Sequence, residues 1–199
     1  MPSNPAVFLD RDGVLIEEVN YLCEVGQVHL IPGAAEAVAN QNLSGVPVVV
    51  VTNQAGIARG YFPEGRVAKV HAYLDELLAE RGAWVDRYYY CPHHPDAAVA
   101  QYRVECECRK PRPGMLTRAA QEMSLDLAGS YLVGDKASDL AAGGTAGCRT
   151  VLVRTGHGAK VDATAAEARW NLVRVAVDLN EAVRHLLPEM IGTRRKMSA

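Results

Sequence analysis

The segment VPVVVVT at residues 46–52 limits the possible folds of this chain more than any other stretch. It is short, rich in β-branched residues and apolar throughout, as expected of a strand that is covered on both faces. A strand with one solvated face would instead alternate apolar and polar residues. The segment therefore predicts a mostly parallel sheet with helices on both sides.

The rest of the chain alternates strand-like and helix-like segments, as such a sheet requires. Further apolar runs predict strands at residues 6–9, 87–91, 130–135, 150–153 and 173–179. Helical patterns fall between or after them, at residues 33–43, 63–82, 114–123, 136–147 and 180–187. We find no internal repeat or linker in the sequence. It predicts a single α/β domain over residues 1–199, three-layered and Rossmann-like.

Composition and charge argue against several classes of function. The net charge of −2 offers no broad basic surface for nucleic acid or for a membrane. No apolar run reaches the length of about 20 residues that spans a bilayer. The segment MPSNPAVFLD at residues 1–10 lacks the pattern of a secretory signal. We expect a cytoplasmic monomer that binds neither nucleic acid nor membrane.

Polar side chains follow several predicted strands at the point where each strand ends. The groups are Asp10-Arg11-Asp12-Gly13, Thr52-Asn53-Gln54 and Gly134-Asp135-Lys136, and Arg109-Lys110 precede a PRPG turn. Singly, each group has an ordinary explanation as a helix cap or a turn. Because the carboxyl ends of parallel strands meet at one edge of the sheet, we expect these side chains to converge there.

This set of groups fits phosphoryl transfer through an aspartyl-phosphate. The Asp10 carboxylate can attack phosphorus and form a covalent intermediate. Asp12 can protonate the leaving alkoxide and later deprotonate the attacking water. A magnesium ion between Asp10 and Asp135 would offset the repulsion between carboxylate and phosphate. Thr52 and Lys110 can bind the phosphoryl oxygens as charge spreads in the transition state.

Four motifs of the chain resemble those of the haloacid dehalogenase superfamily of phosphatases. They are DRDGV, VVVTNQ, CRKPRPG and VGDKASD, in that order, and the resemblance covers most of the chain. It implies a catalytic set of Asp10, Asp12, Thr52 and Lys110, with Asp10 as nucleophile and Asp12 as general acid and base. It also implies that Mg²⁺ is held by Asp10, the backbone carbonyl of Asp12 and Asp135, with Lys136 beside it.

Other segments resemble the members of this superfamily that hydrolyse a heptose bisphosphate. The segments are TNQAGIARGYF, YYYCPHHP, CECRKPRPGML and VLVRTGHG. These relatives lack a large cap domain and remove the 7-phosphate of D-glycero-D-manno-heptose 1,7-bisphosphate, a step of lipopolysaccharide biosynthesis. The resemblance implies that the substrate is contacted by Glu18, Val19, Asn20, Tyr21, Thr52, Asn53, Gln54, Arg109 and Lys110. We expect Arg109 to bind the second phosphate, because a guanidinium can do so in bidentate fashion.

Two other functions are compatible with the same motifs. Histidinol-phosphate phosphatases share them, and Glu17 and Glu18 would suit the cationic amine of that substrate. Arg109 and the GIARGYF segment favour a sugar bisphosphate instead. A non-catalytic module of this fold that binds a phospho-ligand would be expected to lack a catalytic or metal-binding carboxylate, whereas this chain retains all of them.

Three of the five cysteines lie near histidines in the sequence. An odd number of cysteines argues against a disulfide framework. The cluster consists of Cys91, Cys106, Cys108 and either His93 or His94. Four such ligands suit a closed, tetrahedral zinc site, although three reduced thiols beside a solvated histidine are the simpler alternative. The resemblance assigns His93 as the fourth ligand, and such a zinc ion would be structural, holding the loop that precedes Arg109 and Lys110.

Overall fold

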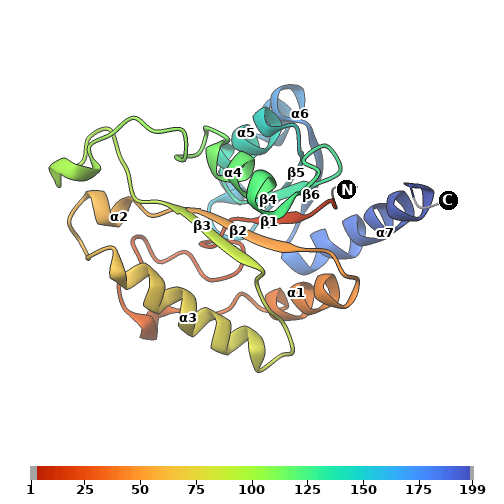
Figure 1. The fold of residues 1–199 in the computed structure, drawn as a ribbon, viewed down its shortest axis with the longest axis horizontal. Coiled ribbons are helices and arrows are strands. Elements are labelled where there is room, and N and C mark those ends of the chain that lie inside the picture. Colours follow the sequence, from red (N-terminus) through yellow and green to blue (C-terminus); the bar gives the residue numbers. More distant parts are fainter. Residues whose placement is uncertain (1–3, 198–199) are drawn as a thin grey trace.

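The structure is a computed structural model that describes residues 4–197, and its centre is one parallel sheet (Figure 1). Six strands form the sheet in the order β3-β2-β1-β4-β5-β6, and every neighbouring pair is parallel. They are β1 (Val7–Leu9), β2 (Val48–Asn53), β3 (Arg87–Cys91), β4 (Tyr131–Gly134), β5 (Arg149–Val153) and β6 (Leu172–Ala176). The strand order reverses between β1 and β4, which is where such sheets bind ligands.

Helices cover both faces of the sheet, as the apolar run of β2 requires. One face carries α1 (Ala34–Leu43), α3 (Gly65–Ala79) and α7 (Leu179–Met197), and the other carries α4 (Gly114–Met123), α5 (Ala137–Ala146) and α6 (Ala163–Trp170). Val48 and Val50 pack in the core on the first face, whereas Val49 and Val51 pack in the core on the second. Successive side chains of a strand point to opposite faces, so β2 is apolar at every position.

The predicted strands and their flanking helices are confirmed, with boundaries that differ by a few residues. Two helices were not predicted: the short α2 (Ala55–Ala58), which follows β2, and α6. α6 has a weak apolar period, yet its N-cap is recognisable because the Asp162 side chain accepts hydrogen bonds from Thr164 N and Ala165 N. α7 extends beyond the predicted end at residue 187 and contains Pro188, since Met190 still packs in the main core.

Loops cover the carboxyl edge of the sheet. Residues 10–33 connect β1 to α1, and residues 92–113 connect β3 to α4. Their regular structure consists of two short 3-10 turns, η1 (Val25–Gln27) and η2 (Ala100–Tyr102), and a third, η3 (Gly158–Lys160), follows β5. Within residues 4–197 the carboxyl edge of the sheet therefore carries loops and no inserted domain. The described helices include no segment with the length and hydropathy of a membrane span.

A buried histidine links α3 to the sheet. His71 is 8% exposed, and its ring stacks on Tyr88 of β3 with centroids 4.2 Å apart. Burial and the nearby charge of Arg11 lower the pKa of His71 to about 3. The folded protein therefore keeps His71 neutral at pH values where an exposed imidazole is charged.

We expect the free energy of unfolding to fall as the pH is lowered below the ordinary histidine pKa of 6.5, in part because of His71. The unfolded chain binds a proton at this residue below pH 6.5, whereas the folded chain does so only near pH 3, so acid favours unfolding. His71→Gln should reduce the slope of the free energy of unfolding against pH by up to about 1.4 kcal/mol per pH unit. Urea titrations of both proteins at several pH values measure the two slopes, and parallel slopes would contradict this account.

Candidate active site

A cavity of about 320 Å³ lies at the carboxyl ends of β1, β2 and β4. The predicted residues that line it are Asp10, Asp12, Glu18, Asn20, Tyr21, Thr52, Asn53, Gln54, Arg109, Lys110 and Lys136. Asp135 lies directly beside them and is fully buried. Side chains from four separate stretches of sequence thus converge at one edge of the sheet, as the parallel topology requires.

An ion pair between Asp10 and Lys110 lies at the base of this cavity. Lys110 Nζ lies 2.9 Å from Asp10 Oδ1, and the same oxygen accepts a hydrogen bond of 2.8 Å from Arg11 N. Burial alone would raise the pKa of Asp10, but the charges of Lys110 and Lys136 outweigh it and hold the pKa below its ordinary value. Asp10 is therefore ionised at neutral pH, which is the state that a nucleophile requires.

Asp139, which was not predicted as a site residue, holds the other side of Lys110. Lys110 Nζ lies 2.8 Å from Asp139 Oδ1 and donates a hydrogen bond of 2.8 Å to Val51 O. Asp139 Oδ2 accepts from Lys136 N at 2.9 Å in the first turn of α5. An acid at the third position of a helix is a known capping signal, so the sequence indicated a cap but not the contact with Lys110.

Asp135 has the environment of a metal ligand. One oxygen each from Asp10, Asp135 and Asp139 lie within 4.8 Å of one another. Asp135 Oδ2 accepts a hydrogen bond of 2.8 Å from His157 N, whereas the buried Oδ1 accepts no hydrogen bond from the described residues and has Lys136 Nζ 3.4 Å away. Burial, together with repulsion from Asp10 and Asp139, raises the pKa of Asp135 to about 7 despite the charge of Lys136. A divalent cation at Oδ1 would offset both the cost of burying the carboxylate and its repulsion by the neighbouring acids.

Two glycines allow the backbone to close over Asp135. Gly13 has φ +85° and Gly156 has φ +56°, and a Cβ atom on either would clash with the Asp135 carboxylate. The glycine of DRDGV is therefore required both for its left-handed backbone and for its close approach to the acid.

Asp12 lies above the cavity floor and receives several hydrogen bonds. Gln54 Nε2 donates to Asp12 Oδ2 at 3.1 Å and also to Thr52 Oγ1 at 2.9 Å. Thr52 Oγ1 lies 3.5 Å from Asp12 Oδ2, and the Arg11 guanidinium contacts both carboxylate oxygens. These donors fix the orientation of the Asp12 carboxylate.

Asn53 and Arg109 connect the cavity to the loop after β3. The Asn53 side chain donates to Lys110 O at 3.0 Å and accepts from Lys110 N at 3.1 Å. Arg109 donates from Nη1 to His93 O at 3.1 Å and still lines the cavity. Asn53 thus positions the Lys110 backbone, and its predicted contact with substrate stays a prediction.

The predicted substrate segment 18–21 divides between cavity and core. Glu18 Oε2 lies 2.8 Å from Lys136 Nζ and 3.5 Å from His157 Nε2. Asn20 and Tyr21 line the cavity with left-handed backbones, at φ 48° and 60°. Val19 packs against the main core instead, and its predicted substrate contact stays a prediction.

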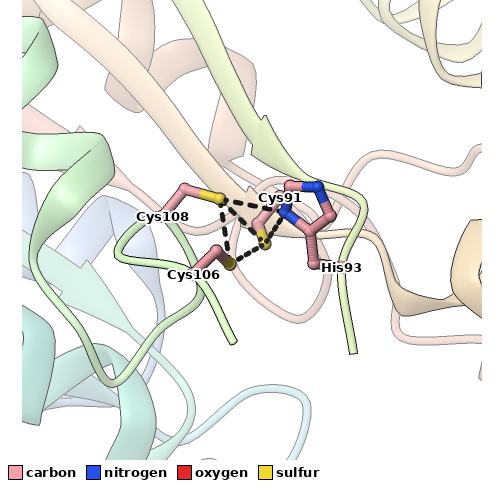
Figure 2. A group of neighbouring side chains, drawn as sticks. All are labelled: Cys91, His93, Cys106 and Cys108. Carbon is pink, nitrogen blue, oxygen red and sulfur yellow. Dashed lines mark hydrogen bonds between the residues drawn. The ribbon is translucent and has the colours of Figure 1, made fainter. Parts of the chain in front are cut away.

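Three cysteines and a histidine form a second cluster at the end of β3 (Figure 2). The Sγ atom of Cys108 lies 3.2 Å from that of Cys91, 3.2 Å from that of Cys106 and 3.5 Å from His93 Nδ1. The four side chains point toward a common centre, and their ligand atoms lie within 4.8 Å of one another. The hydrogen bond between Cys108 and Cys91 is the main cause that lowers the pKa of Cys108 to about 5. The donor set is that of a tetrahedral structural zinc site.

The geometry places one of the two adjacent histidines in the cluster, and its role as a zinc ligand stays a prediction. His93 belongs to the cluster, whereas His94 Nδ1 accepts a hydrogen bond of 3.1 Å from Asp96 N. Spacing alone could not separate adjacent imidazoles.

Comparison with known proteins gives consistent matches. The HAD-hydrolase-like family model matches residues 107–182. The D-glycero-beta-D-manno-heptose-1,7-bisphosphate 7-phosphatase of Photorhabdus laumondii is 43% identical over 181 residues, or 90% of this chain and 95% of that protein. The protein of the same name from Yersinia pestis is 44% identical over 183 residues, or 92% of this chain and 96% of that protein.

A solved structure agrees with these relatives. The crystal structure of D,D-heptose 1,7-bisphosphate phosphatase from B. bronchiseptica, complexed with magnesium and phosphate, superposes with a TM-score of 0.82 and 36% identity. The match covers 93% of this chain and 99% of that one. The chain therefore belongs to the haloacid dehalogenase-like hydrolases, in the family of the heptose-1,7-bisphosphate 7-phosphatases.

Proposed function

We propose that this chain is a phosphoric monoester hydrolase that removes the 7-phosphate of D-glycero-D-manno-heptose 1,7-bisphosphate. The observation that carries the proposal is the ionised Asp10, which lies 2.9 Å from the buried ammonium of Lys110 at the floor of the cavity. The names of the relatives from P. laumondii and Y. pestis supply the substrate, and they specify the β anomer. We extend that anomer to this chain.

The residues of the cavity divide the reaction between them. An Asp10 oxygen attacks phosphorus while the bond from phosphorus to the sugar oxygen breaks, and Asp12 gives its proton to that oxygen. Asp12 then takes a proton from a water molecule that attacks the aspartyl-phosphate, which releases inorganic phosphate and restores Asp10. Lys110 and Thr52 bind the phosphoryl oxygens throughout, and their positions do not depend on the identity of the sugar.

The acidic residues fit a magnesium ion. Asp10, the backbone carbonyl of Asp12 and Asp135 would hold it, with Lys136 adjacent, and the buried Asp135 Oδ1 without a hydrogen bond supports this assignment. Bound there, Mg²⁺ supplies a Lewis acid that neutralises charge on the phosphoryl group. Asp139 shares the cluster, but Lys110 and Lys136 N already engage its two oxygens.

The second cluster fits a structural zinc ion held by Cys91, His93, Cys106 and Cys108. All four ligand positions belong to the protein, so no position is open for a reacting water molecule. Arg109 lies next to the cluster, because its Nη1 donates a hydrogen bond to the backbone carbonyl of His93. We infer that the metal orders the loop and thereby places Arg109 for the second phosphate.

Histidinol phosphate is the alternative substrate, and Glu18 is the residue that would favour it. Glu18 lines the cavity, but its carboxylate already contacts Lys136 Nζ at 2.8 Å and faces His157. Its charge is thus largely compensated, which leaves little attraction for a cationic amine. Among the described residues, Nη1 of Arg109 donates to His93 O, and its remaining side-chain N–H groups can bind an anionic group instead.

Three wider expectations belong to the same proposal. A single phosphatase domain over residues 1–199 is supported by one continuous sheet between residues 7 and 176. A cytoplasmic location is supported by the five free cysteines, three of which belong to the candidate metal cluster. An oxidising compartment would favour disulfide formation by such thiols. The predicted monomer stays a prediction.

Asp10→Asn should reduce turnover of heptose 1,7-bisphosphate by at least about 1,000-fold, because an amide cannot act as the nucleophile. The fold should survive, since Lys110 keeps its contacts with Asp139 and Val51 O. Phosphate release measures the activity, and thermal unfolding verifies the fold. A well-folded variant with wild-type turnover would refute Asp10 as the nucleophile. Wild-type protein that hydrolyses histidinol phosphate in preference to heptose 1,7-bisphosphate would refute the proposed substrate.

Purified protein should contain about one zinc ion per chain, and Cys106→Ser should lose it. The variant should also unfold at a lower temperature, because metal binding contributes to the stability of the loop. Elemental analysis and thermal unfolding measure the two effects. Cys23→Ser is the matched control, since Cys23 lies outside the cluster and should leave the zinc content unchanged. Fresh protein without zinc, prepared without chelators, would count against the site.

Arg109→Ala should lower kcat/KM for the bisphosphate by about 10- to 100-fold, the usual effect of losing hydrogen bonds to a charged group. For a heptose 7-phosphate that lacks the second phosphate, we expect a change of less than about 3-fold, since Arg109 then has no partner to lose. Arg118→Ala removes an exposed arginine of α4 that pairs with Glu122 and serves as the control. Equal losses on both substrates would show that Arg109 does not bind the second phosphate.

A further inference from the structure

Arg11, between the two catalytic aspartates, is buried although it is charged. Its side chain is 1% exposed, and its Nε–H donates to no partner among the described residues. A buried guanidinium is costly to desolvate, so a buried ion pair often gives no more stability than apolar residues in place of both partners. The benefit of Arg11 to the fold is therefore small, which directs attention to what its guanidinium contacts.

The guanidinium contacts the carboxylate proposed as general acid and base. Arg11 Nη2 lies 3.0 Å from Asp12 Oδ1 and 2.9 Å from Asp12 Oδ2, so one nitrogen bridges both oxygens. Asp12 itself is 15% exposed and lines the cavity. The pair thus joins a buried, fixed cation to a carboxylate that faces the substrate.

His71 contacts the other terminal nitrogen of the same guanidinium. Arg11 Nη1 lies 3.4 Å from His71 Nε2, which can accept when the imidazole proton is on Nδ1. The His71 ring is in turn held by stacking on Tyr88, whose hydroxyl donates to Asp75 Oδ1 at 2.7 Å. His71 and Asp75 both belong to α3, so a helix outside the cavity supports the guanidinium from behind.

We propose that Arg11 is a positioning residue that fixes the Asp12 carboxylate for proton transfer, and that His71 fixes Arg11. The inference rests on the proposed function, because it assumes that Asp12 moves protons. An arginine side chain does not release its own proton in proteins, so the transferred proton is carried by Asp12 alone. Arg11 acts by holding the orientation of that carboxylate between the leaving oxygen and the attacking water.

Two phosphate esters of similar size separate this role from a general structural one. The p-nitrophenyl group of p-nitrophenyl phosphate leaves without help from an acid, whereas the alkoxide of benzyl phosphate needs a proton. In Arg11→Met, the first-turnover rate on benzyl phosphate should fall about 10- to 100-fold. The first-turnover rate on p-nitrophenyl phosphate should change by less than about 3-fold. Later turnovers should be slow, because hydrolysis of the aspartyl-phosphate still needs Asp12 to activate water.

Two further variants keep the test decisive if Arg11→Met folds poorly. His71→Phe retains a ring to stack on Tyr88 and removes the Nε2 acceptor, so it should give the same pattern with a smaller amplitude. Arg11→Lys restores the charge without the planar fork and should recover part of the first-turnover rate on benzyl phosphate. Circular dichroism verifies that each protein is folded.

The outcomes distinguish this inference from the proposed function. Equal losses on both esters in the folded variants, or a change confined to KM, would overturn the role of Arg11 as a positioning residue. Wild-type protein that hydrolyses both esters but not heptose 1,7-bisphosphate would overturn the substrate and leave the test of Arg11 valid. Wild-type protein that hydrolyses no ester would overturn both.

Discussion

The buried ammonium of Lys110 is the charge around which the rest of the active site is arranged. It contacts Asp10, Asp139 and Val51 O, and each of these comes from a different strand end or helix start. An unpaired ammonium at this depth would be strongly unfavourable, so the three elements must be in place together. Burial would lower the pKa of Lys110, but the two carboxylates raise it above its ordinary value. The cation is therefore permanent, and the nucleophile beside it stays ionised.

The fold could be predicted because each strand and helix has its pattern within one short segment. Part of the site could not be predicted, because it depends on contacts between segments that are remote in sequence. β2 is apolar on both faces, and the polar groups at the ends of β1, β2 and β4 are adjacent in sequence to the strands that position them. Asp139 lies within α5, and its importance depends on Lys110, which arrives from a loop remote in sequence. His93 and His94 are adjacent, so only the path of the loop separates them. The burial of Arg11 likewise depends on α3, which no pattern around residue 11 reveals.

Chemistry and recognition are carried by different parts of this structure. Of the groups proposed to act on phosphorus, Asp10, Thr52 and Asp135 are at strand ends, where the sheet holds the backbone rigidly. The groups proposed to face the rest of the substrate are Glu18, Asn20 and Tyr21 of the loop after β1, and Arg109 of the loop that carries the cysteine cluster. Asn53 joins the two parts, because its amide binds the Lys110 backbone from β2. Changes in the loops can thus alter the preferred substrate while the phosphoryl site is preserved.

The strand order has a consequence for the synthesis of the chain. β1, the first strand made, is the central neighbour of β2 and β4, and β4 is made only after β2 and β3. A nascent chain therefore carries the nucleophile long before the ribosome has added its buried cation or the acid of β4. Proteins emerge in order from the N-terminus, so an incomplete chain would expose a naked pair of acids with no means of binding phosphate. The phosphoryl site can therefore be complete only after Lys110, Asp135 and Asp139 have been added to the chain.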